Sequence, residues 1–257
     1  MFKKLIVAAI AAVAAIAAVG TWRCTRWWRT WGVRPIDSTI PLPGDDLIAG
    51  AQVTDTRGIT IAAPPEAVWP WLVQMGYGRA GWYSYDKLDM KGASADAIMP
   101  ELQGLAVGDT VPTDPSGGFE VKVLDTGKAM VLYVDTAMIA ARSTTAGETA
   151  EATPAGLAAS GKFLETATPP EFKASWAFVL HPERDGSTRL LERTRFWVAE
   201  SKGAPKALAP LLGFGVFVML QRQMLGIRQR AERNPVPPVT APAGAPAEAS
   251  EEALAPA

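Results

Sequence analysis

The chain has 257 residues, which fits one large domain or two small ones, and its formal net charge is −1. This balance excludes the strongly basic surface typical of nucleic-acid-binding proteins. One cysteine, Cys24, and one histidine, His181, exclude an internal disulfide and a zinc site built from Cys and His ligands. No metal, cofactor or nucleic-acid partner is therefore expected.

Residues 1–31 predict a membrane anchor. The segment 5–20 carries no charge over 16 positions, and Thr21 and Trp22 extend it towards the ~20 residues that cross a bilayer. Tryptophans and arginines alternate directly after it, as suits the lipid headgroup zone. A cleaved signal peptide is the alternative. The Trp/Arg cluster favours an uncleaved single span in a bacterial inner membrane, and the side on which the domain lies stays open.

The segment 32–52 holds three prolines and three glycines and predicts an extended connector leaving the membrane. The β-branched content of 53–63 predicts a strand. Residues 64–76 predict a short helix, with a proline at its first position and Gly76 at its end. Pro70 removes a backbone donor, so a kink or a break into two helices is expected.

The stretch "GYGRAGWYSYD" (76–86) contains G-x-G-x-x-G at Gly76, Gly78 and Gly81. A dinucleotide-binding fingerprint needs a strand before its first glycine and a helix that opens at its last. Here a helix precedes the glycines and aromatic residues follow them. The glycines are therefore expected to form a tight turn beneath bulky aromatics.

Two antiparallel hairpins are expected in the middle of the chain, formed by 119–127 with 128–137 and by 174–183 with 187–200. In the first, Phe119, Val121 and Val123 are expected on one face. The composition of 140–171, between the hairpins, predicts a long mobile loop.

The strands of the second hairpin alternate clearly. One face carries Trp176, Phe178 and Leu180 in the first strand and Leu190, Glu192, Thr194 and Phe196 in the second. Arg193 and Arg195 point to the opposite side, where ion pairs on the sheet surface are expected.

One long helix is expected over 206–234. Its apolar run from Ala209 to Leu220 is 12 residues, too short to span a bilayer, which favours a buried core helix. The following segment, 235–257, holds six prolines and eight alanines and is expected to be disordered.

The order of elements predicts an α+β fold in which a curved antiparallel sheet wraps around a long C-terminal helix, over residues 53–234. Such a fold can leave an apolar cavity between sheet and helix.

The chain resembles the SRPBCC superfamily, the START-like or polyketide cyclase-type helix-grip proteins, and within it a bacterial membrane-associated subgroup. The matching stretches are "WG" (31–32), "PLPGD" (41–45), "TRGITIAAPPEAVWPWLVQMGYGRAGWYSYDKLD" (56–89), "VGD" (107–109), "SWAFVL" (175–180), "TRLLERTR" (188–195) and "MLGIRQRAE" (224–232). The resemblance implies a cavity for a hydrophobic ligand, and it supplies no catalytic residue.

Aromatic residues carry the remaining functional signal, because some could line such a cavity and offer a hydroxyl or indole group to a ligand. The candidate lining residues are Trp82, Tyr83, Tyr85, Phe119, Tyr133, Trp176, Phe178, Phe196, Phe214, Phe217 and Met224.

Catalytic motifs are sparse. His181 is expected in a surface turn, and Asp86 and Asp89 are expected to cap a helix or pair with an arginine. The favoured function is binding or carriage of a small hydrophobic, lipid-like molecule by a membrane-anchored domain. One alternative is a cyclase- or dehydratase-like enzyme that uses Tyr83, Tyr85 or Asp86 for proton transfer. Another is a non-catalytic domain that contacts a membrane protein.

Overall fold

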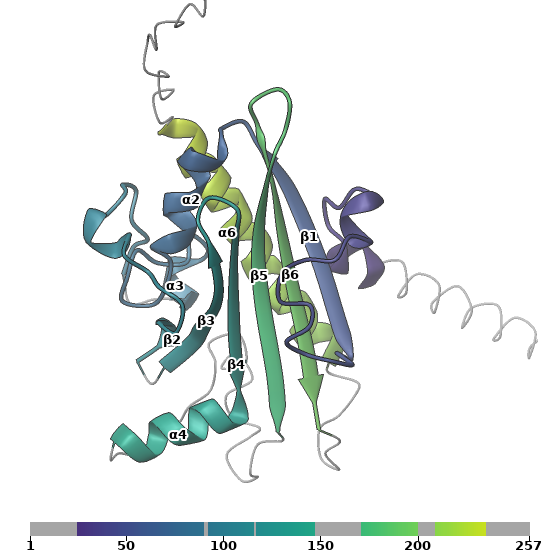
Figure 1. Cartoon of the computed structure of the whole chain (residues 1–257), viewed down its shortest axis with the longest axis vertical. Coiled ribbons are helices and arrows are strands. Elements are labelled where there is room, and N and C mark those ends of the chain that lie inside the picture. The colour runs from purple at the N-terminus through teal and green to yellow at the C-terminus, as the bar shows by residue number, and fades with distance from the viewer. Residues whose placement is uncertain (1–24, 90–91, 116, 147–170, 200–208, 235–257) are drawn as a thin grey trace, which may run out of the picture.

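The computed structural model describes residues 25–89, 92–115, 117–146, 171–199 and 209–234. They form one antiparallel sheet crossed on one face by a long helix (Figure 1). The expected membrane anchor at 5–22 and the expected tail at 235–257 lie outside these residues. Among the described helices, none combines the length and the apolar character that a membrane span requires.

The sheet has six strands in the order β1-β6-β5-β4-β3-β2, and every neighbouring pair is antiparallel. The strands are β1 (Val53–Ile61), β2 (Thr110–Asp114), β3 (Gly117–Asp125), β4 (Ala129–Asp135), β5 (Phe172–Pro182) and β6 (Thr188–Val198). Both predicted hairpins are confirmed, as β3 with β4 and β5 with β6. The first strand pairs with the last, so the two halves of the chain form one unit.

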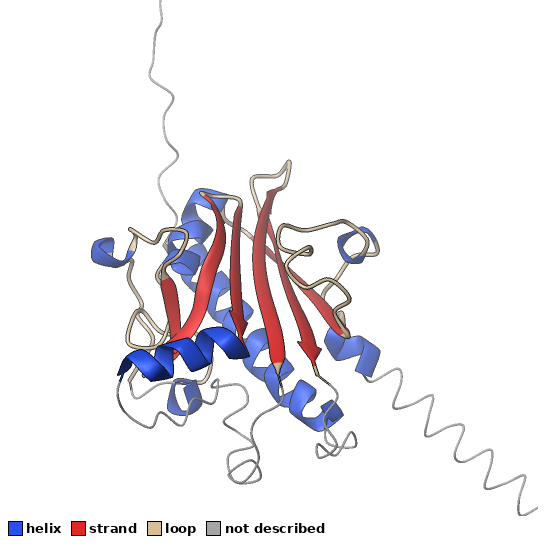
Figure 2. Cartoon of the chain, turned by 60° about the horizontal axis from the view of Figure 1, so that its bottom comes forward, coloured by secondary structure: helices blue, strands red, loops and turns tan. Residues whose placement is uncertain are grey.

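The helices lie around this sheet (Figure 2). They are η1 (Ile36–Ser38), α2 (Pro65–Val73), α3 (Asp86–Asp89), η2 (Pro100–Leu102), α4 (Thr136–Ala146) and α6 (Ala209–Arg233), and residues 25–29 are also helical. The long C-terminal helix predicted over 206–234 is confirmed as α6. The expected loop at 140–171 differs, because its first seven residues belong to α4 and 147–170 lie outside the described residues.

Different segments of the chain pack against the two faces of the sheet. Side chains of the inner face, such as Phe178 and Leu190, pack with α2 and with Met224 of α6 in the main apolar cluster. Side chains of the outer face, such as Leu191, pack against Leu42 in a smaller cluster. The period-2 alternation of the strands therefore separates two environments, as the second hairpin predicts.

A β-bulge in β3 changes the expected face of one residue. Val121 lies opposite Leu132, whereas Val123 lies opposite Val131, so one extra residue is inserted on β3. Val131 belongs to the outer face, where it meets Gly44. The expectation that Val121 and Val123 share a face is therefore wrong.

The helix α2 runs through Pro70 without interruption. Of the kink or break that Pro70 predicts, the break into two helices is not observed, although an interior proline costs about 3 kcal/mol. Val68, Trp71 and Leu72 are at most 1% exposed. Burial of these side chains offsets the lost backbone hydrogen bond, because each fully buried large apolar side chain contributes roughly 1.5–3 kcal/mol.

The glycine-rich stretch after α2 forms a tight turn, as predicted. Gly76 and Gly81 exchange backbone hydrogen bonds of 3.1 and 3.2 Å. The φ angles of Gly76, Gly78 and Gly81 are 133°, 69° and 88°, which L side chains rarely adopt. The turn places the following aromatic residues against the inner face of the sheet.

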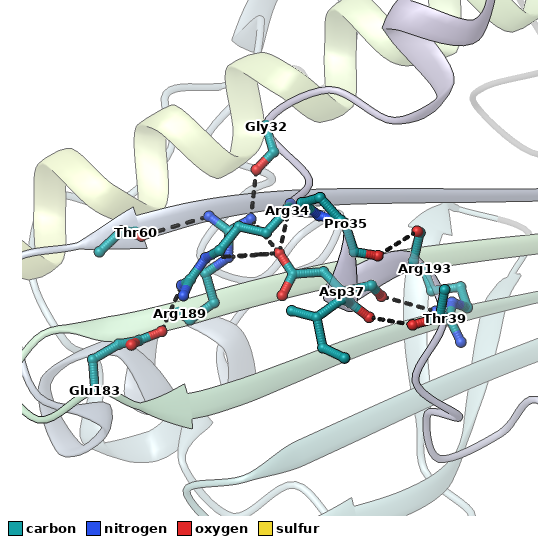
Figure 3. Close-up of polar contacts among 11 residues, drawn as sticks. Gly32, Arg34, Pro35, Asp37, Thr39, Thr60, Glu183, Arg189 and Arg193 are labelled. Atoms are coloured by element: carbon teal, nitrogen blue, oxygen red, sulfur yellow. Dashed lines mark hydrogen bonds and ion pairs between the residues drawn. The ribbon is translucent and has the colours of Figure 1, made fainter.

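Residues 34–48, which we call the strap, lie across the outer face of the sheet (Figures 1 and 3). Arg189 of β6 donates to Oδ2 of Asp37 through Nε at 3.1 Å and Nη2 at 2.6 Å. Arg193, four residues further along β6, donates to Asp45 at 2.6 Å. The segment 32–52 is thus packed on the sheet, unlike the extended connector that its composition predicts.

These ion pairs are buried, since Asp37, Arg189 and Arg193 are each 5% exposed. Burial alone would raise the pKa of Asp37. Hydrogen bonds from the backbone N–H of Arg34 and from Arg189 outweigh that effect and hold the pKa below its ordinary value. The strap is therefore fastened by compensated charges as well as by apolar contacts.

Candidate ligand-binding interior

Aromatic side chains pack against one another on the inner face of the sheet. Trp82, from the loop after α2, stacks on Trp176 of β5 with ring centroids 5.4 Å apart and an interplanar angle of 20°. Phe178 and Phe119 contact the same indole at 4.9 and 5.8 Å. Trp176 is thus the centre of an aromatic group that joins the sheet to the loop.

Two charged side chains lie within this apolar interior. Arg57 of β1 and Glu192 of β6 are directly opposite each other in the strand register. They are 1% and 0% exposed. Directly opposite residues on one face have Cβ atoms about 4.5–5.5 Å apart, so the two groups are neighbours.

Glu192 has one oxygen bound and one without a protein partner. Trp176 Nε1 donates to Oε1 at 3.0 Å. Oε2 is buried and has no hydrogen-bond partner in the described part of the chain. Burial raises the pKa of this carboxyl to about 7, although the charge of Arg57 and the Trp176 hydrogen bond act in the opposite direction.

Arg57 is also incompletely bonded. Its Nε donates to the backbone oxygen of Trp28 at 3.3 Å and its Nη2 to Asp55 at 3.2 Å. The guanidinium lies 5.7 Å from the ring centroid of Phe217 on α6. Nη1 has no partner among the described residues, which leaves a buried N–H donor on the residue that lies opposite Glu192 in the strand register.

Gln223 adds a third buried polar group, from α6. It is 2% exposed, and its Nε2 lies 3.4 Å from the sulfur of Met75. Its Oε1 is buried without a partner within the described segments. Three buried polar atoms on three elements therefore lack a partner within the described segments: Nη1 of Arg57 on β1, Oε2 of Glu192 on β6 and Oε1 of Gln223 on α6.

The loop after α2 holds α6 in place. Tyr83 adopts a positive φ of 57°, and its backbone oxygen packs on Gly226 so closely that an added Cβ would lie 2.1 Å away. Ser84 Oγ donates to the backbone oxygen of Met219 at 2.9 Å. Gln74 donates to the hydroxyl of Tyr83 at 3.0 Å, and burial raises the pKa of this hydroxyl. The contacts of Tyr83 with Gly226 and of Ser84 with Met219 therefore hold α6 close to the loop.

The structure brings most of the predicted lining residues to the inner side. These are Trp82, Tyr83, Phe119, Trp176, Phe178, Phe196, Phe217 and Met224. Tyr85 and Phe214 are 42% and 39% exposed. Tyr133 lies on the outer face, where its hydroxyl donates to Asp135 at 3.0 Å and burial raises its pKa to about 12.

The residues considered for proton transfer do not meet in the interior. Asp86 accepts from the N–H and Oγ of Ser94 at 3.0 and 2.5 Å, which closes a local loop. The hydroxyl of Tyr83 is bonded by Gln74, and Tyr85 faces solvent. The side chain of Asp89 lies outside the described residues.

Sequence reasoning missed Arg57, Glu192 and Gln223 as site residues. A signal was present for Glu192, because alternation places this carboxylate on the same face as Leu190 and Phe196. An acidic residue on an apolar strand face is rarely fully buried unless it is paired.

No protein-family model and no curated protein matches the chain. Solved structures that are similar include protein MLL2253 from Mesorhizobium loti, at 16% identity over 72% of this chain and 100% of that chain, with a TM-score of 0.37. Ara h 8.0201 is 15% identical over 71% and 99% of the two chains, with a TM-score of 0.32. The Zhui aromatase/cyclase from Streptomyces sp. R1128 is 12% identical over 70% and 94%, with a TM-score of 0.26.

The chain's own topology establishes the coarse fold. A six-stranded antiparallel sheet carries a long C-terminal helix across its inner face, which is the helix-grip arrangement that the resemblance implies.

Proposed function

We propose that the domain binds a small, largely apolar molecule that carries one polar group, between the inner face of the sheet and α6. The unpaired Oε2 of Glu192, buried among aromatic side chains, is the observation that carries this proposal. A buried polar atom without a partner costs about 1–3 kcal/mol. A ligand that supplies the missing hydrogen bond recovers this free energy on binding.

The chemistry of the two neighbouring groups suggests which polar group fits. A carboxylate oxygen accepts a hydrogen bond, and Nη1 of Arg57 donates one. A hydroxyl group can do both, because it donates to Glu192 and accepts from Arg57. The apolar body of the ligand would contact Trp176, Trp82 and Phe178, at about 25 cal/mol per Å² of apolar area removed from water. An alcohol or a phenol is therefore the favoured ligand class.

The membrane anchor belongs to the same proposal. The uncharged run at 5–20 would hold the domain beside a bilayer, where lipid-soluble compounds concentrate. A carrier in that position would take such a compound from the lipid, with Glu192 selecting for its polar group.

Proton transfer is a second candidate function, and it would rest on Glu192. Its pKa of about 7 lies near neutral pH, where a buried carboxylate can both accept and release a proton. An enzyme of this kind would convert the bound molecule, whereas a carrier would release it unchanged.

The test compares 2-naphthol with naphthalene, which differ by one hydroxyl. The full chain in nanodiscs is titrated with each compound at a pH above 7, in wild-type form and as Glu192→Leu. We expect wild-type protein to bind 2-naphthol at least about tenfold more tightly, which is 1.4 kcal/mol, and Glu192→Leu to lose this preference.

Glu101→Leu is the matched control, because this residue is exposed and lies in η2, outside the strands of the sheet. It should keep the preference for 2-naphthol. Equal wild-type affinities for the two compounds, or no binding of either, would overturn the proposal. Chemical change of bound 2-naphthol would favour the enzymatic candidate.

A further inference from the structure

Exposed aromatic side chains gather where the helical residues 25–29 meet the first half of α6. Trp27 and Phe214 are 55% and 39% exposed. Both pack on Phe217, with ring centroids 5.4 and 5.9 Å away. Phe217 is itself 2% exposed, and Trp28 and Trp31 flank it at 6.4 Å each. We call Trp27 and Phe214 the aromatic patch.

The patch lies along the edge strand β1, since Arg29 forms an ion pair with Asp55 and Phe217 contacts the guanidinium of Arg57. At one end of the sheet, Val53 begins β1 and Val198 ends β6, and they are 36% and 37% exposed. At the opposite end, Glu232 of α6 accepts a hydrogen bond from the N–H of Ala62, just after β1. Therefore α6 runs antiparallel to β1, and the patch lies beside the first half of α6 and the middle of β1 (Figure 1).

We infer that this aromatic patch rests against a lipid bilayer and sets the orientation of the whole domain on the membrane. The chain before the patch argues for this occupant. An uncharged run of 16 residues ends at Gly20, five positions before Thr25. Five residues span at most about 18 Å when fully extended. The patch therefore cannot lie far from whatever surface holds that run.

The residues of the patch match the headgroup zone of a bilayer. Tryptophan is enriched there, because its ring is apolar and its N–H is polar. Exposed Arg26 adjoins Trp27 in sequence, and arginine can extend its charged end towards lipid phosphates while its stem stays on an apolar surface.

The helical residues at 25–29 are fixed to the domain and do not act as a free tether. Gly58 N–H donates to the backbone oxygen of Trp31 at 3.1 Å, which occupies the free edge of β1. Arg29 forms an ion pair with Asp55 at 2.5 Å. Trp28 packs so closely on α6 that a Cβ added at Gly213 would lie 2.8 Å from its ring. An anchored run before Thr25 would therefore orient the sheet as well as tether it.

This orientation has a consequence for the interior. Phe217 contacts the patch on one side and the guanidinium of Arg57, 5.7 Å away, on the other. A single aromatic residue then separates the lipid-facing patch from the buried polar groups. The inference does not require that a ligand binds there.

The experiment uses the full chain in vesicles of phosphatidylcholine and phosphatidylglycerol, with Cys24→Ser as background. A single cysteine at the patch, Phe214→Cys, carries an NBD fluorophore. The control carries it at the β5–β6 turn, as Arg184→Cys, which is exposed at the end of the sheet where β1 finishes. Quenching by headgroup spin-labelled lipid and by aqueous iodide is then measured for each.

We expect several-fold stronger lipid quenching and weaker iodide quenching at position 214 than at position 184. Equal quenching at the two positions, or protein that does not float with the vesicles, would overturn the inference. Shielding of position 214 that depends on protein concentration and not on spin-labelled lipid would also overturn it, because a second copy would then cover the patch.

Trp27→Cys provides a second labelled site in case Phe214→Cys does not fold, which circular dichroism reports. Binding of 2-naphthol is measured on the same samples. Loss of lipid contact with naphthol binding retained refutes this inference alone, and the converse refutes the proposed function alone.

Discussion

Trp176 and Glu192 are joined by a 3.0 Å hydrogen bond between the indole N–H and Oε1. They lie on adjacent strands but not directly opposite, since Trp176 faces Thr194 and Glu192 faces Phe178. Such diagonal neighbours on one sheet face remain within reach of long and aromatic side chains. The bond fixes one oxygen of the carboxylate and leaves the other available.

The raised pKa of Glu192 predicts how stability depends on pH. The folded pKa of about 7 exceeds the ordinary value of 4.5, so between these values the folded protein binds more protons than the unfolded chain. The contribution of Glu192 to the free energy of unfolding is therefore highest below pH 4.5, falls by roughly 3 kcal/mol as pH rises to 7, and then levels off. Urea unfolding of Glu192→Gln across this range should lack that decline.

Glu101→Gln, in the exposed η2 segment, should keep the wild-type decline. An equally steep decline in Glu192→Gln would assign the proton uptake to another group.

Removing the indole N–H of Trp176 should destabilise the charged form of Glu192. Trp176→Phe keeps an aromatic ring against Trp82 and leaves both carboxylate oxygens unpaired. Because the hydrogen bond lowers the pKa, its loss should move the decline in stability to higher pH and cost about 1–3 kcal/mol above neutral pH. Denaturant unfolding at acid and alkaline pH measures both effects.

Trp197→Phe is the control, since this half-buried ring contacts Lys173 instead of a carboxylate. If Trp176→Phe and Trp197→Phe show the same pH profile, the hydrogen bond does not influence Glu192.

The buried ion pair of the strap predicts that substitution of Asp37 strongly destabilises the fold. Asp37→Asn leaves Arg189 buried without its charged partner, which costs about 3–5 kcal/mol. The folded pKa of Asp37 is lowered, so its contribution is present above the ordinary value of 3.8 and is lost as pH falls further. The variant should therefore be less stable than wild type at neutral pH, and the difference should shrink in strong acid.

Asp46→Asn tests the same strap at an exposed position and should change stability by at most about 0.5 kcal/mol. Similar losses for the two variants at neutral pH would mean that the buried ion pair is not what fastens the strap.

Two glycines of α6 give opposite predictions. A Cβ at Gly226 would lie 2.1 Å from the backbone oxygen of Tyr83, whereas nothing lies within 4 Å of one at Gly215. Gly226→Ala should destabilise by at least about 1–3 kcal/mol, and Gly215→Ala should stabilise by up to about 1 kcal/mol through helix propensity. Thermal unfolding of both variants checks this, and equal shifts would show that α6 does not pack on the loop at Tyr83.

The sequence predicts those features that depend on local residue patterns, such as which side chains of a strand share a face. Alternation places Trp176, Phe178 and Leu180 on one face, and they do belong to the main cluster. The bulge at Val121 could not be predicted, because a single inserted residue leaves the composition of the strand unchanged. Pro70 predicts a kink or a break, and α2 is not broken because tertiary burial of Trp71 and Leu72 outweighs the local cost.

The missed features depend on partners distant in sequence. Asp37 and Arg189 are 152 residues apart, so no spacing rule relates them, and the prolines and glycines of the strap favour an extended segment. Glu192 is on the expected face, but its complete burial depends on α6 and on the pairing of β6 with β1. Neither is visible in the local sequence.

The most direct test of the account is the carboxyl carbon resonance of Glu192 in full-length protein labelled with ¹³C at glutamate carboxyl groups. Glu192→Gln identifies this resonance by its absence. At a pH above 7, saturating 2-naphthol should shift the Glu192 signal, and naphthalene should leave it nearly unchanged. A Glu192 signal that does not respond to bound 2-naphthol would contradict the claim that this carboxylate holds the polar group of the ligand.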